Sequence, residues 1–346
     1  MNSINEPKRV LVTGSQGYVG TEFLLKLRNL GYQATGLDVG FFKSSNLDNS
    51  IEVESIKRDL RDQSDIDLSK YECIVHLAAL SNDPLGELNP KLTYTINRDS
   101  AIELAIKAKT QGVHRFIFAS TQSIYGISSS DVELCEDHPK NPITAYAKSK
   151  WDAEQEILGL STNDFIPVAV RPSTIFGWGS RIRNDIIFNN MIASGLKNNK
   201  IEVHTDGTPH RPVVHISDVL DFFCLLITAP STTIRGQAYN LGAMGGNFTV
   251  LEIAKSASRC LNNVPIVLNT ENLQDQRSYK VSFEKARRDL GFTASLGLDF
   301  GGAGIIDKYN KLSSRNREKY FTDTFRLTVL RKLLEAGTLN SDLKWT

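Results

Sequence analysis

Cysteine is scarce in this chain, and its few cysteines lie far apart. The four thiols among 346 residues are Cys73, Cys135, Cys224 and Cys260. They form no Cys-x-x-Cys pair and no Cys/His spacing typical of a metal site, so the sequence predicts no bound metal. Reduced, scattered cysteines are usual in cytoplasmic proteins, and we expect that location.

Long apolar runs and an excess of one charge are also missing. No apolar stretch reaches the ~18 residues of a membrane-spanning helix. Residues 1–9 are polar and lead directly into a strand, unlike a signal peptide. The formal net charge is +1 at pH 7, so no basic field attracts nucleic acid. We therefore expect neither a membrane nor a nucleic acid as a partner.

What is present is an ordinary globular composition. Hydrophobic residues make up 40% of the chain and charged residues 23%, a balance that excludes disorder of the whole chain. At roughly 100–200 residues per domain, this length corresponds to one large domain or two of moderate size. Such a chain buries a sizeable core without disulfides.

Short apolar strands alternate with helical patterns in the first half of the chain. Val19, Phe23, Leu27 and Leu30, for example, recur at helical spacing just before Gly31. This alternation predicts an α/β fold of the Rossmann type, with a doubly wound parallel sheet. The predicted strands are 9–13, 33–38, part of 51–59, 73–79, 115–120 and 166–171, and the predicted helices are 18–30, 91–111 and 145–158.

The regular alternation stops after residue 171. We predict an NAD-binding Rossmann domain formed by residues 1–171 plus about 213–244. A smaller, discontinuous α/β substrate-binding lobe is predicted for about 172–212 plus 245–346. Near the end of the chain, Phe325, Val329 and Leu333 keep helical spacing, so we expect an ordered terminal helix within residues 313–346.

A glycine-rich turn, Gly14-Ser-Gln-Gly17-Tyr-Val-Gly20, joins the first strand to the first helix. Glycines here let the backbone approach a diphosphate, and the helix N-terminus offers N–H groups to it. Asp38 ends the second strand, where a carboxylate binds both hydroxyls of the adenosine ribose and repels a 2′-phosphate. The pattern predicts a dinucleotide site that prefers NAD to NADP, with an ordinary tight turn as the alternative.

Tyr146 and Lys150 lie four residues apart and share one face of the predicted helix. A phenol has a pKa of about 10 and is a poor base at neutral pH. A nearby ammonium group stabilises the phenolate and lowers that pKa. The pair is therefore suited to moving a proton to or from a sugar hydroxyl, although the same spacing also occurs on solvated helix faces.

These features occur together with several others, in an order that resembles the extended short-chain dehydrogenase/reductase family, in its nucleotide-sugar epimerase/dehydratase branch. The resemblance covers residues 9 to about 295. The matching segments are the TGxxGxxG turn 13–20, Asp38, Asp59-Leu60, His76-Leu-Ala-Ala79, Asn97, the Ser-Thr and Tyr-Gly pairs within 120–126, Tyr146 with Lys150, Arg171-Pro172 and the stretch 206–219.

The resemblance implies an enzyme with a tyrosine acid/base. Thr121 matches the residue that hydrogen-bonds the reacting sugar oxygen. Tyr146 matches the acid/base, and Lys150 matches the residue that binds the nicotinamide ribose. Arg211 matches an arginine that binds the substrate diphosphate, and a surface ion pair is its alternative role.

The resemblance also implies two sets of binding residues. The cofactor set is Gly14, Gln16, Gly17, Tyr18, Val19, Gly20, Asp38, Asp59, Leu60, Leu77, Ala78, Ala79, Asn97, Tyr146, Lys150 and Pro172. The substrate set is Ser81, Asn82, Asp83, Thr121, Gln122, Ser123, Asn189, Arg211 and Arg277.

The chain departs from related dehydratases directly after Thr121. Those enzymes carry an acid and a glutamate where this chain has Gln122 and Ser123, and their glutamate removes the sugar C5 proton. Neither an amide nor an unassisted hydroxyl acts as that base. This difference argues against a 4,6-dehydratase. Two roles stay open for Asp83: an extra acid or base, or a residue that only shapes the turn before Pro84.

For three further residues, a purely structural role is the alternative to a role in ligand binding. His76 lies within a strand, and we expect a packed core residue there rather than a ligand. Trp178 either flanks the nucleotide or sugar or packs within the lobe. His210 adjoins Arg211 and either faces the nucleotide or takes no part in the site.

The function that we expect is that of an NAD-dependent nucleotide-sugar epimerase, which works through a 4-keto intermediate by hydride transfer at C4. The alternative is an NAD-dependent C4 dehydrogenase or reductase of a nucleotide hexose or heptose. A 4,6-dehydratase and a non-catalytic NAD-binding protein rank below both. The family usually dimerises through two helices, here 91–111 and 145–158, so we expect a homodimer that binds a nucleotide-diphosphate sugar.

Overall fold

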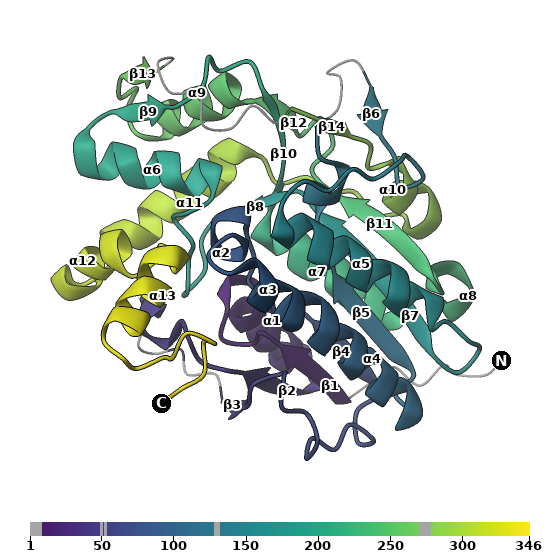
Figure 1. Ribbon diagram of the computed structural model, residues 1–346. Coiled ribbons are helices and arrows are strands. Elements are labelled where there is room, and N and C mark those ends of the chain that lie inside the picture. Colours follow the sequence, from purple (N-terminus) through teal and green to yellow (C-terminus); the bar gives the residue numbers. More distant parts are fainter. Residues whose placement is uncertain (1–8, 49–50, 52–53, 128–131, 270–277) are drawn as a thin grey trace.

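The computed structural model describes residues 9–48, 51, 54–127, 132–269 and 278–346. In this part of the chain, seven strands form one sheet at the centre of the molecule (Figure 1). Their order is β11-β7-β5-β4-β1-β2-β3, and every neighbouring pair is parallel. The strands are β1 (Arg9–Thr13), β2 (Gln33–Asp38), β3 (Ser55–Lys57), β4 (Cys73–His76), β5 (Arg115–Ala119), β7 (Ile166–Pro172) and β11 (Gln237–Leu241).

Strand β11 has no counterpart among the predicted strands. It lies at the edge of the sheet, and its five residues include Gln237 and Asn240 rather than an unbroken apolar run. Asn240 is buried, and its backbone N–H donates to Glu136 Oε1 at 2.7 Å. Strand β4 is shorter than predicted: it ends at His76, and residues 77–79 belong to the loop that follows it.

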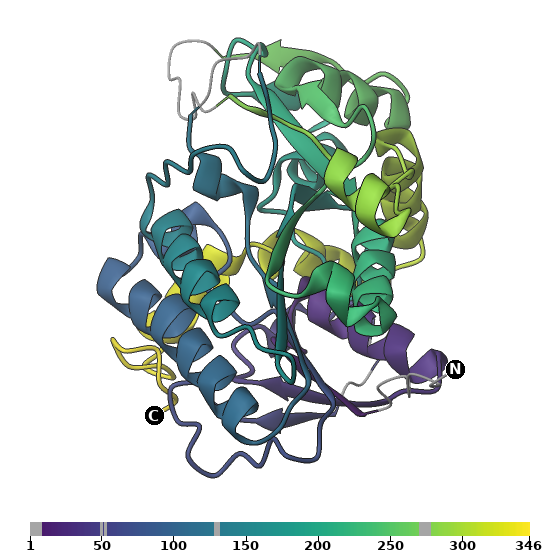
Figure 2. The ribbon, with the colours of Figure 1, turned by 90° about the vertical axis from the view of Figure 1, so that its right-hand side faces the viewer.

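Helices cover both faces of the sheet, which confirms the predicted fold class (Figure 2). On one face, apolar residues of α4 and α5, such as Leu104 and Ile157, pack against strand residues that include Phe116. On the other face, α1 and α7 do the same, with Leu24 and Leu226 among the buried residues. The bounds are α1 (Tyr18–Asn29), α4 (Ser100–Thr110), α5 (Ala145–Gly159), α7 (Ile216–Thr228) and α8 (Ser231–Ile234).

The predicted helix 91–111 is one helical run with a wider turn in its middle. It consists of α3 (Pro90–Tyr94), a π-helical stretch η2 (Thr95–Asp99) and α4. Asn89 caps its start, because its Oδ1 accepts a hydrogen bond from Leu92 N. Three further short helices stand close to the sheet: η1 (Lys43–Ser45), α2 (Asp83–Gly86) and η3 (Gln122–Tyr125).

Beyond the carboxyl ends of the strands lies a smaller lobe, at the top of Figure 1. In the described residues it holds three small sheets, ordered β12-β10-β8, β13-β9 and β14-β6. Their strands are β6 (Glu133–Leu134), β8 (Thr174–Phe176), β9 (Ile201–Val203), β10 (His210–His215), β12 (Asn247–Thr249), β13 (Ile266–Leu268) and β14 (Lys280–Val281). The helices are α6 (Ile187–Asn198), α9 (Val250–Cys260), α10 (Glu284–Leu290), α11 (Leu298–Asn310) and α12 (Ser314–Thr322), and the last helix, α13 (Arg326–Glu335), contacts α2.

The end of the chain returns from the lobe to the sheet. Residues 313–346 contain two helices, α12 and α13, where the sequence predicts one. Leu330 and Leu343 are buried in one cluster with Phe41 and Leu85, beside β2 and β4. The end of the chain therefore packs on the sheet as well as on the lobe, while the exact division into two domains stays a prediction. No helix of the described residues has the length and apolar character needed to cross a membrane.

Candidate active site

A cavity of about 350 Å³ opens at the carboxyl ends of the central strands. Parallel sheets bind ligands at this edge, because the loops that leave the strands diverge there. Of the residues predicted from the sequence, those that line it are Gly14, Gly17, Tyr18, Val19, Gly20, Asp38, Asp59, Leu60, Leu77, Ala78, Ala79, Ser81, Asn82, Asp83, Thr121, Gln122, Ser123, Tyr146, Lys150, Pro172 and Arg211.

The glycine turn has the geometry that a dinucleotide diphosphate requires. Gly14 has a φ of +71°, and a Cβ there would lie 2.7 Å from the backbone N of Ala78. A Cβ on Gly20 would lie 2.1 Å from the carbonyl oxygen of Gly14. No side chain caps the first turn of α1. Its N–H groups therefore remain available to an anion at this end of the cavity.

Asp38 stands at the end of β2, next to this turn. Its carboxylate accepts hydrogen bonds from the backbone N–H groups of Gln16 at 3.0 Å and Gly40 at 2.6 Å. Burial raises the pKa of Asp38 despite these two bonds. The side chain of Gln16 is not part of the cavity wall. Its backbone contributes instead, by holding the carboxylate that the sequence assigns to the adenosine ribose.

Asp59 and Leu60 line the same end of the cavity. Asp59 forms an ion pair with Arg61 at 2.5 Å. Burial raises the pKa of Asp59, but the hydrogen bonds and charge of Arg61 outweigh it and lower the pKa overall. The guanidinium of Arg61 also donates to the carbonyl oxygens of Asp342 and Leu343, which ties the end of the chain to this side of the cavity.

The proposed catalytic residues come from two adjacent elements. Thr121 follows β5 and caps η3, with its Oγ1 accepting from Ser123 N at 3.1 Å. Tyr146 and Lys150 lie on α5, which Thr144 caps by accepting from Ala147 N. Tyr146 is hydrogen-bonded to Thr121. The Nζ atom of Lys150 lies 3.9 Å from the ring centroid of Phe118.

The electrostatics of this pair differ from the sequence prediction. The sequence predicts that Lys150 lowers the pKa of Tyr146, and this prediction is wrong for the structure. Burial raises the pKa of Tyr146 to about 12, although the hydrogen bond with Thr121 works against it. Burial also lowers the pKa of Lys150 to about 7. A lysine that is only partly charged at neutral pH gives a buried phenolate little support.

The loop after β4 forms another part of the cavity wall and leads into α2, which lies against the start of α5. Asn97 is fully buried and holds this loop, because its Oδ1 accepts from Leu80 N at 2.8 Å and its Nδ2 donates to Leu80 O at 3.1 Å. It is not part of the cavity wall, so it acts as a support. Gly86 of α2 permits the close approach to α5, since a Cβ there would lie 2.8 Å from the Cβ of Tyr146.

Asp83 has a structural role and also borders the cavity, while its role as an acid or base stays a prediction. It is the first residue of α2, which Asn82 caps by accepting from Leu85 N. Its Oδ1 accepts a hydrogen bond from Thr144 Oγ1 at 2.5 Å, so it links α2 to the start of α5. It also lines the cavity, and its charge raises the pKa of Tyr146.

Gln122 is held by the protein rather than directed at a ligand. Its Nε2 donates to the carbonyl oxygen of Arg171 at 3.0 Å, and its Oε1 accepts from Ser173 Oγ at 3.1 Å. The side chain is 1% exposed. Although it borders the cavity, its hydrogen-bonding groups secure the strand end at β7.

Asn189 lies outside the cavity, contrary to its predicted place in the substrate set. It is fully buried in α6, where its Oδ1 accepts from Gly177 N and its Nδ2 donates to Arg183 O. It therefore shapes the loop after β8. Arg277 falls outside the described residues, and its predicted role stays a prediction.

The structure also shows where His76, Trp178 and His210 lie. His76 is a core residue as predicted: it is fully buried, stacks on Phe118, and its Nδ1 lies 2.9 Å from Thr13 Oγ1. Trp178 stacks on Tyr320 and packs against the core of the lobe. His210 is partly buried and does not line the cavity.

Four arginines of the cavity wall, Arg58, Arg61, Arg183 and Arg326, were not found from the sequence. Arg183 follows β8; its guanidinium pairs with Asp185 at 2.9 Å and donates to Ser81 Oγ at 2.9 Å. Arg326 is the first residue of α13. A local signal for Arg183 was present, because residues 177–183 after β8 combine two glycines, Trp178 and two arginines. Nothing local in the sequence distinguishes Arg326 from other arginines near the end of the chain.

The fold and the site define a class of protein, a Rossmann-type dinucleotide-binding enzyme of the short-chain dehydrogenase/reductase kind. Residues 10–242 match the NAD dependent epimerase/dehydratase family, and the chain belongs to this family. NAD is accordingly its cofactor. The glycine turn, the uncapped start of α1 and the carboxylate of Asp38 fit such a group.

Individual relatives are similar over most of their length. The chain is 27% identical over 329 residues to UDP-glucose 4-epimerase GEPI48 of Cyamopsis tetragonoloba, which covers 84% of this chain and 91% of that protein. It is 26% identical over 327 residues to UDP-glucose 4-epimerase of Bacillus subtilis, covering 84% and 93%. The solved structure of MoeE5 in complex with UDP-glucuronic acid and NAD is 26% identical, with a TM-score of 0.75 and coverage of 88% and 99%.

Proposed function

We propose that this protein is a nucleotide-sugar 4-epimerase that removes hydride from sugar C4 and returns it to the opposite face. The observation that carries the proposal is the meeting of Thr121, Tyr146 and Lys150 in one cavity with the glycine turn and Asp38. The similarity to UDP-glucose 4-epimerases supports it. When bound, NAD supplies the hydride acceptor and donor.

Tyr146 is the residue that we assign to the proton at the C4 oxygen. With a pKa of about 12, its phenol is protonated at neutral pH and is hydrogen-bonded to Thr121. Thr121 holds the sugar oxygen within reach of the phenol. When C4 is oxidised, the phenolate form of Tyr146 takes the hydroxyl proton and becomes a phenol, and when the 4-keto group is reduced the phenol gives that proton back. Between these two steps Tyr146 is a neutral phenol. Before the first step and after the second it is a phenolate, which Lys150 would stabilise in its charged form.

Arg211 supplies the charge for the substrate diphosphate. It lies on β10, is 8% exposed and borders the cavity. Its Nη1 donates to the carbonyl oxygen of His210 at 2.9 Å, which orients the guanidinium. A planar, permanently charged group of this kind suits a nucleotide diphosphate. A nucleotide-diphosphate sugar is therefore the substrate class that we propose.

The wall around Gln122 argues against elimination of water. A dehydratase needs a base for the C5 proton, and the amide of Gln122 is engaged by Arg171 O and Ser173 Oγ. On this side of the cavity, Asp83 is the remaining carboxylate of the described wall residues. It is already bonded to Thr144. The alternative with the same fold and residues is a C4 dehydrogenase or reductase, in which hydride moves once.

Product analysis separates these activities. The purified enzyme is incubated with NAD and with UDP-glucose or UDP-glucuronic acid, and products are examined by mass spectrometry and proton NMR. We expect an unchanged mass, inversion at C4 and no net NADH. Stoichiometric NADH with a product lighter by two hydrogens would instead identify a dehydrogenase. A product lighter by one water would contradict the proposal and make Asp83 the first residue to substitute.

The assembly and location that we propose follow the family. A homodimer would form through the α3–η2–α4 run and α5, which lie beside each other in Figure 1. A cytoplasmic location agrees with the free cysteines among the described residues.

A further inference from the structure

Arg326 brings a buried cation from the end of the chain into the cavity wall. It begins α13, far beyond residues 10–242 that match the family. The residue is 2% exposed and borders the cavity. Buried guanidinium groups are rare unless a carboxylate or another anion compensates them. The surroundings of Arg326 therefore show whether such a partner is present within the protein.

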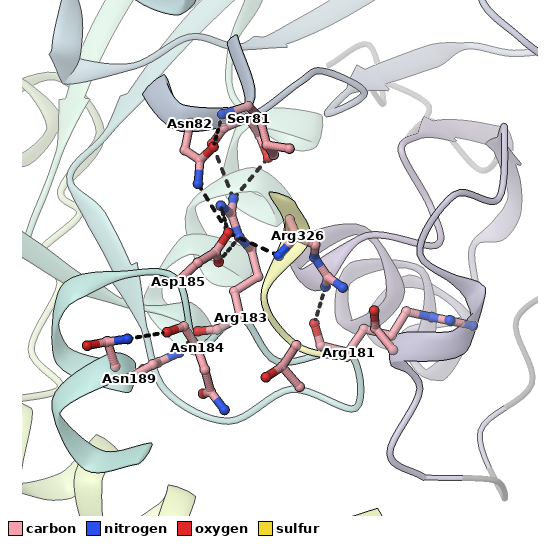
Figure 3. A network of polar contacts seen from close by, with 12 residues as sticks. Ser81, Asn82, Arg181, Arg183, Asn184, Asp185, Asn189 and Arg326 are labelled. Carbon is pink, nitrogen blue, oxygen red and sulfur yellow. Dashed lines mark hydrogen bonds and ion pairs between the residues drawn. The ribbon is translucent and has the colours of Figure 1, made fainter. Parts of the chain in front are cut away.

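Protein groups hold Arg326 in place but do not satisfy it (Figure 3). Its backbone N–H donates to Asp185 Oδ2 at 3.3 Å, and its Nη2 donates to the carbonyl oxygen of Arg181 at 2.6 Å. Its guanidinium carbon lies 4.6 Å from the ring centroid of Phe42. Among the described residues, its Nη1 atom has no hydrogen-bond partner although it is buried.

The carboxylates near Arg326 leave its Nη1 without a hydrogen-bond partner among the described residues. Burial and the charges of Arg183 and Arg181 lower the pKa of Arg326, the charges of Asp185 and Asp38 raise it, and Glu22 is a further carboxylate that acts on Arg181. Arg183 takes both oxygens of Asp185, at 2.9 Å and 3.0 Å. Burial, together with the charges of Arg183 and Arg181, lowers the pKa of Arg326 to about 9. An anion placed beside Nη1 would supply the hydrogen-bond partner that this buried, charged group lacks.

The neighbours of Arg326, Arg181 and Phe42, place its guanidinium on the cofactor side of the cavity. Arg181 donates from its Nε to Thr21 Oγ1 at 3.1 Å, in the first turn of α1, and from Nη1 to the carbonyl oxygen of Phe42. Arg326 therefore lies between the start of α1 and the residues that follow Asp38. A dinucleotide places its diphosphate there, between the glycine turn and the adenosine ribose.

We propose that Arg326 binds the diphosphate of NAD, so that α13 completes the cofactor site. The residues that follow Arg326 pack against the end of the β2 strand, so the position of α13 depends on this packing as well as on the charge of Arg326. Leu330 and Leu343 are buried against Phe41, and Trp345 Nε1 donates to Val39 O at 2.8 Å. Binding of the diphosphate and docking of residues 326–346 would then stabilise each other. The proposal depends on NAD being the cofactor and not on the sugar chemistry.

Ligand binding by the full-length chain, stripped of cofactor and without any sugar nucleotide, tests the proposal. Arg326→Met removes the charge but keeps an apolar stem over Phe42. We expect its affinity for NAD and for ADP-ribose to fall roughly 10-fold to 100-fold, the range for loss of a charged hydrogen bond. The affinity for adenosine should change by less than about 3-fold, because adenosine has no phosphate that Arg326 could bind.

Arg331→Met is the matched control, since Arg331 is exposed on the same helix. It should bind all three ligands as the unmodified chain does. Arg326→Lys should recover part of the lost affinity and serves as the second variant if Arg326→Met does not fold. Unchanged affinity for NAD and ADP-ribose in both Arg326 variants would overturn the proposal. An equal loss for adenosine would overturn it too, because it would show a structural role. Failure of epimerase activity alone would leave these binding results unaffected.

Discussion

At the scale of single residues, burial sets the protonation states in the cavity. Tyr146 and Lys150 are both shifted toward their neutral forms, the phenol to about 12 and the ammonium to about 7. In each case the largest cause is the loss of water around the charged form. The pair therefore has to be brought toward its charged forms by ligands, because the protein alone does not stabilise a phenolate.

Replacement of Tyr146 by Phe tests its role as the acid/base. Tyr146→Phe keeps the ring but removes the hydroxyl that is bonded to Thr121. We expect turnover to fall by about 100-fold or more, the usual contribution of a positioned proton donor or acceptor. Binding of NAD, measured by calorimetry, should stay within a few-fold of the unmodified enzyme. Near-full turnover on a confirmed substrate would show that another group moves the proton.

His76 makes stability depend on pH. Burial, followed by the charge of Lys150, lowers the pKa of His76 to about 3. The unfolded chain takes up a proton near pH 6.5, whereas the folded chain does not. Stability that is fully present above pH 6.5 is therefore lost as the pH falls from 6.5 toward 3, by at most about 1.4 kcal/mol per pH unit.

His76→Phe should flatten this dependence. The ring still stacks on Phe118, but the titrating group is gone. Urea unfolding between pH 7 and pH 4.5 should show a smaller loss of unfolding free energy than in the unmodified chain. His204→Phe, at an exposed position, is the control and should leave the slope unchanged. Parallel slopes for His76→Phe and the unmodified chain would mean that His76 titrates normally.

At the scale of elements, the site is assembled from strand ends and helix starts. Thr121 stands directly after β5, Asp38 closes β2, and the glycine turn joins β1 to α1. The start of α5 is fixed by two carboxylates from outside it, since Asp83 accepts from Thr144 Oγ1 and Glu87 accepts from Ala145 N. Small shifts of α2 would thus be transmitted to Tyr146.

Asp38, at the end of β2, should govern the choice between cofactors. A carboxylate there repels the 2′-phosphate of NADP. We expect the unmodified chain to bind NAD more tightly than NADP, and Asp38→Ala to narrow that preference. Calorimetry with both cofactors measures the ratio, and Asp48→Ala, on the loop that follows η1, is the comparison variant. Tighter binding of NADP than of NAD by the unmodified chain would refute the assignment.

At the scale of the whole molecule, parts of the chain that are distant in the sequence surround the cavity. The lobe provides Arg211 on β10, the sheet provides the turns, and the last residues return to pack beside β2. Figure 2 shows the helices α4 and α5 on the outer side of the sheet, away from the lobe. That outer side is where we place the contact between two copies.

Ile106 on α4 offers a test of this contact. Its side chain is 48% exposed, although it is large and apolar. We expect sedimentation velocity to show a dimer, and Ile106→Glu to shift it toward monomer by placing charges at the contact. Val267→Glu, at a similarly exposed apolar position on β13, should leave the dimer intact. A monomeric unmodified chain would contradict the proposed assembly.

The sequence alone determined the features that depend on neighbouring residues along the chain. Strand and helix periods, the glycine turn, Asp38 and the four-residue spacing of Tyr146 and Lys150 depend only on neighbours along the chain. They were sufficient for the α/β fold and for the family. Most of the residues that line the cavity were named through the family resemblance, and they meet because motifs at strand ends converge at one edge of a parallel sheet.

Only the tertiary structure decided what depends on contacts between distant residues. The edge strand β11 is secured by polar partners, and Asn189 turned out to support a loop instead of lining the cavity. The direction of the Tyr146 pKa required knowledge of its burial. Arg326 reaches the cavity because apolar contacts hold residues 326–346 against the sheet. Desolvation and long-range packing set these outcomes, and neither is encoded in local spacing.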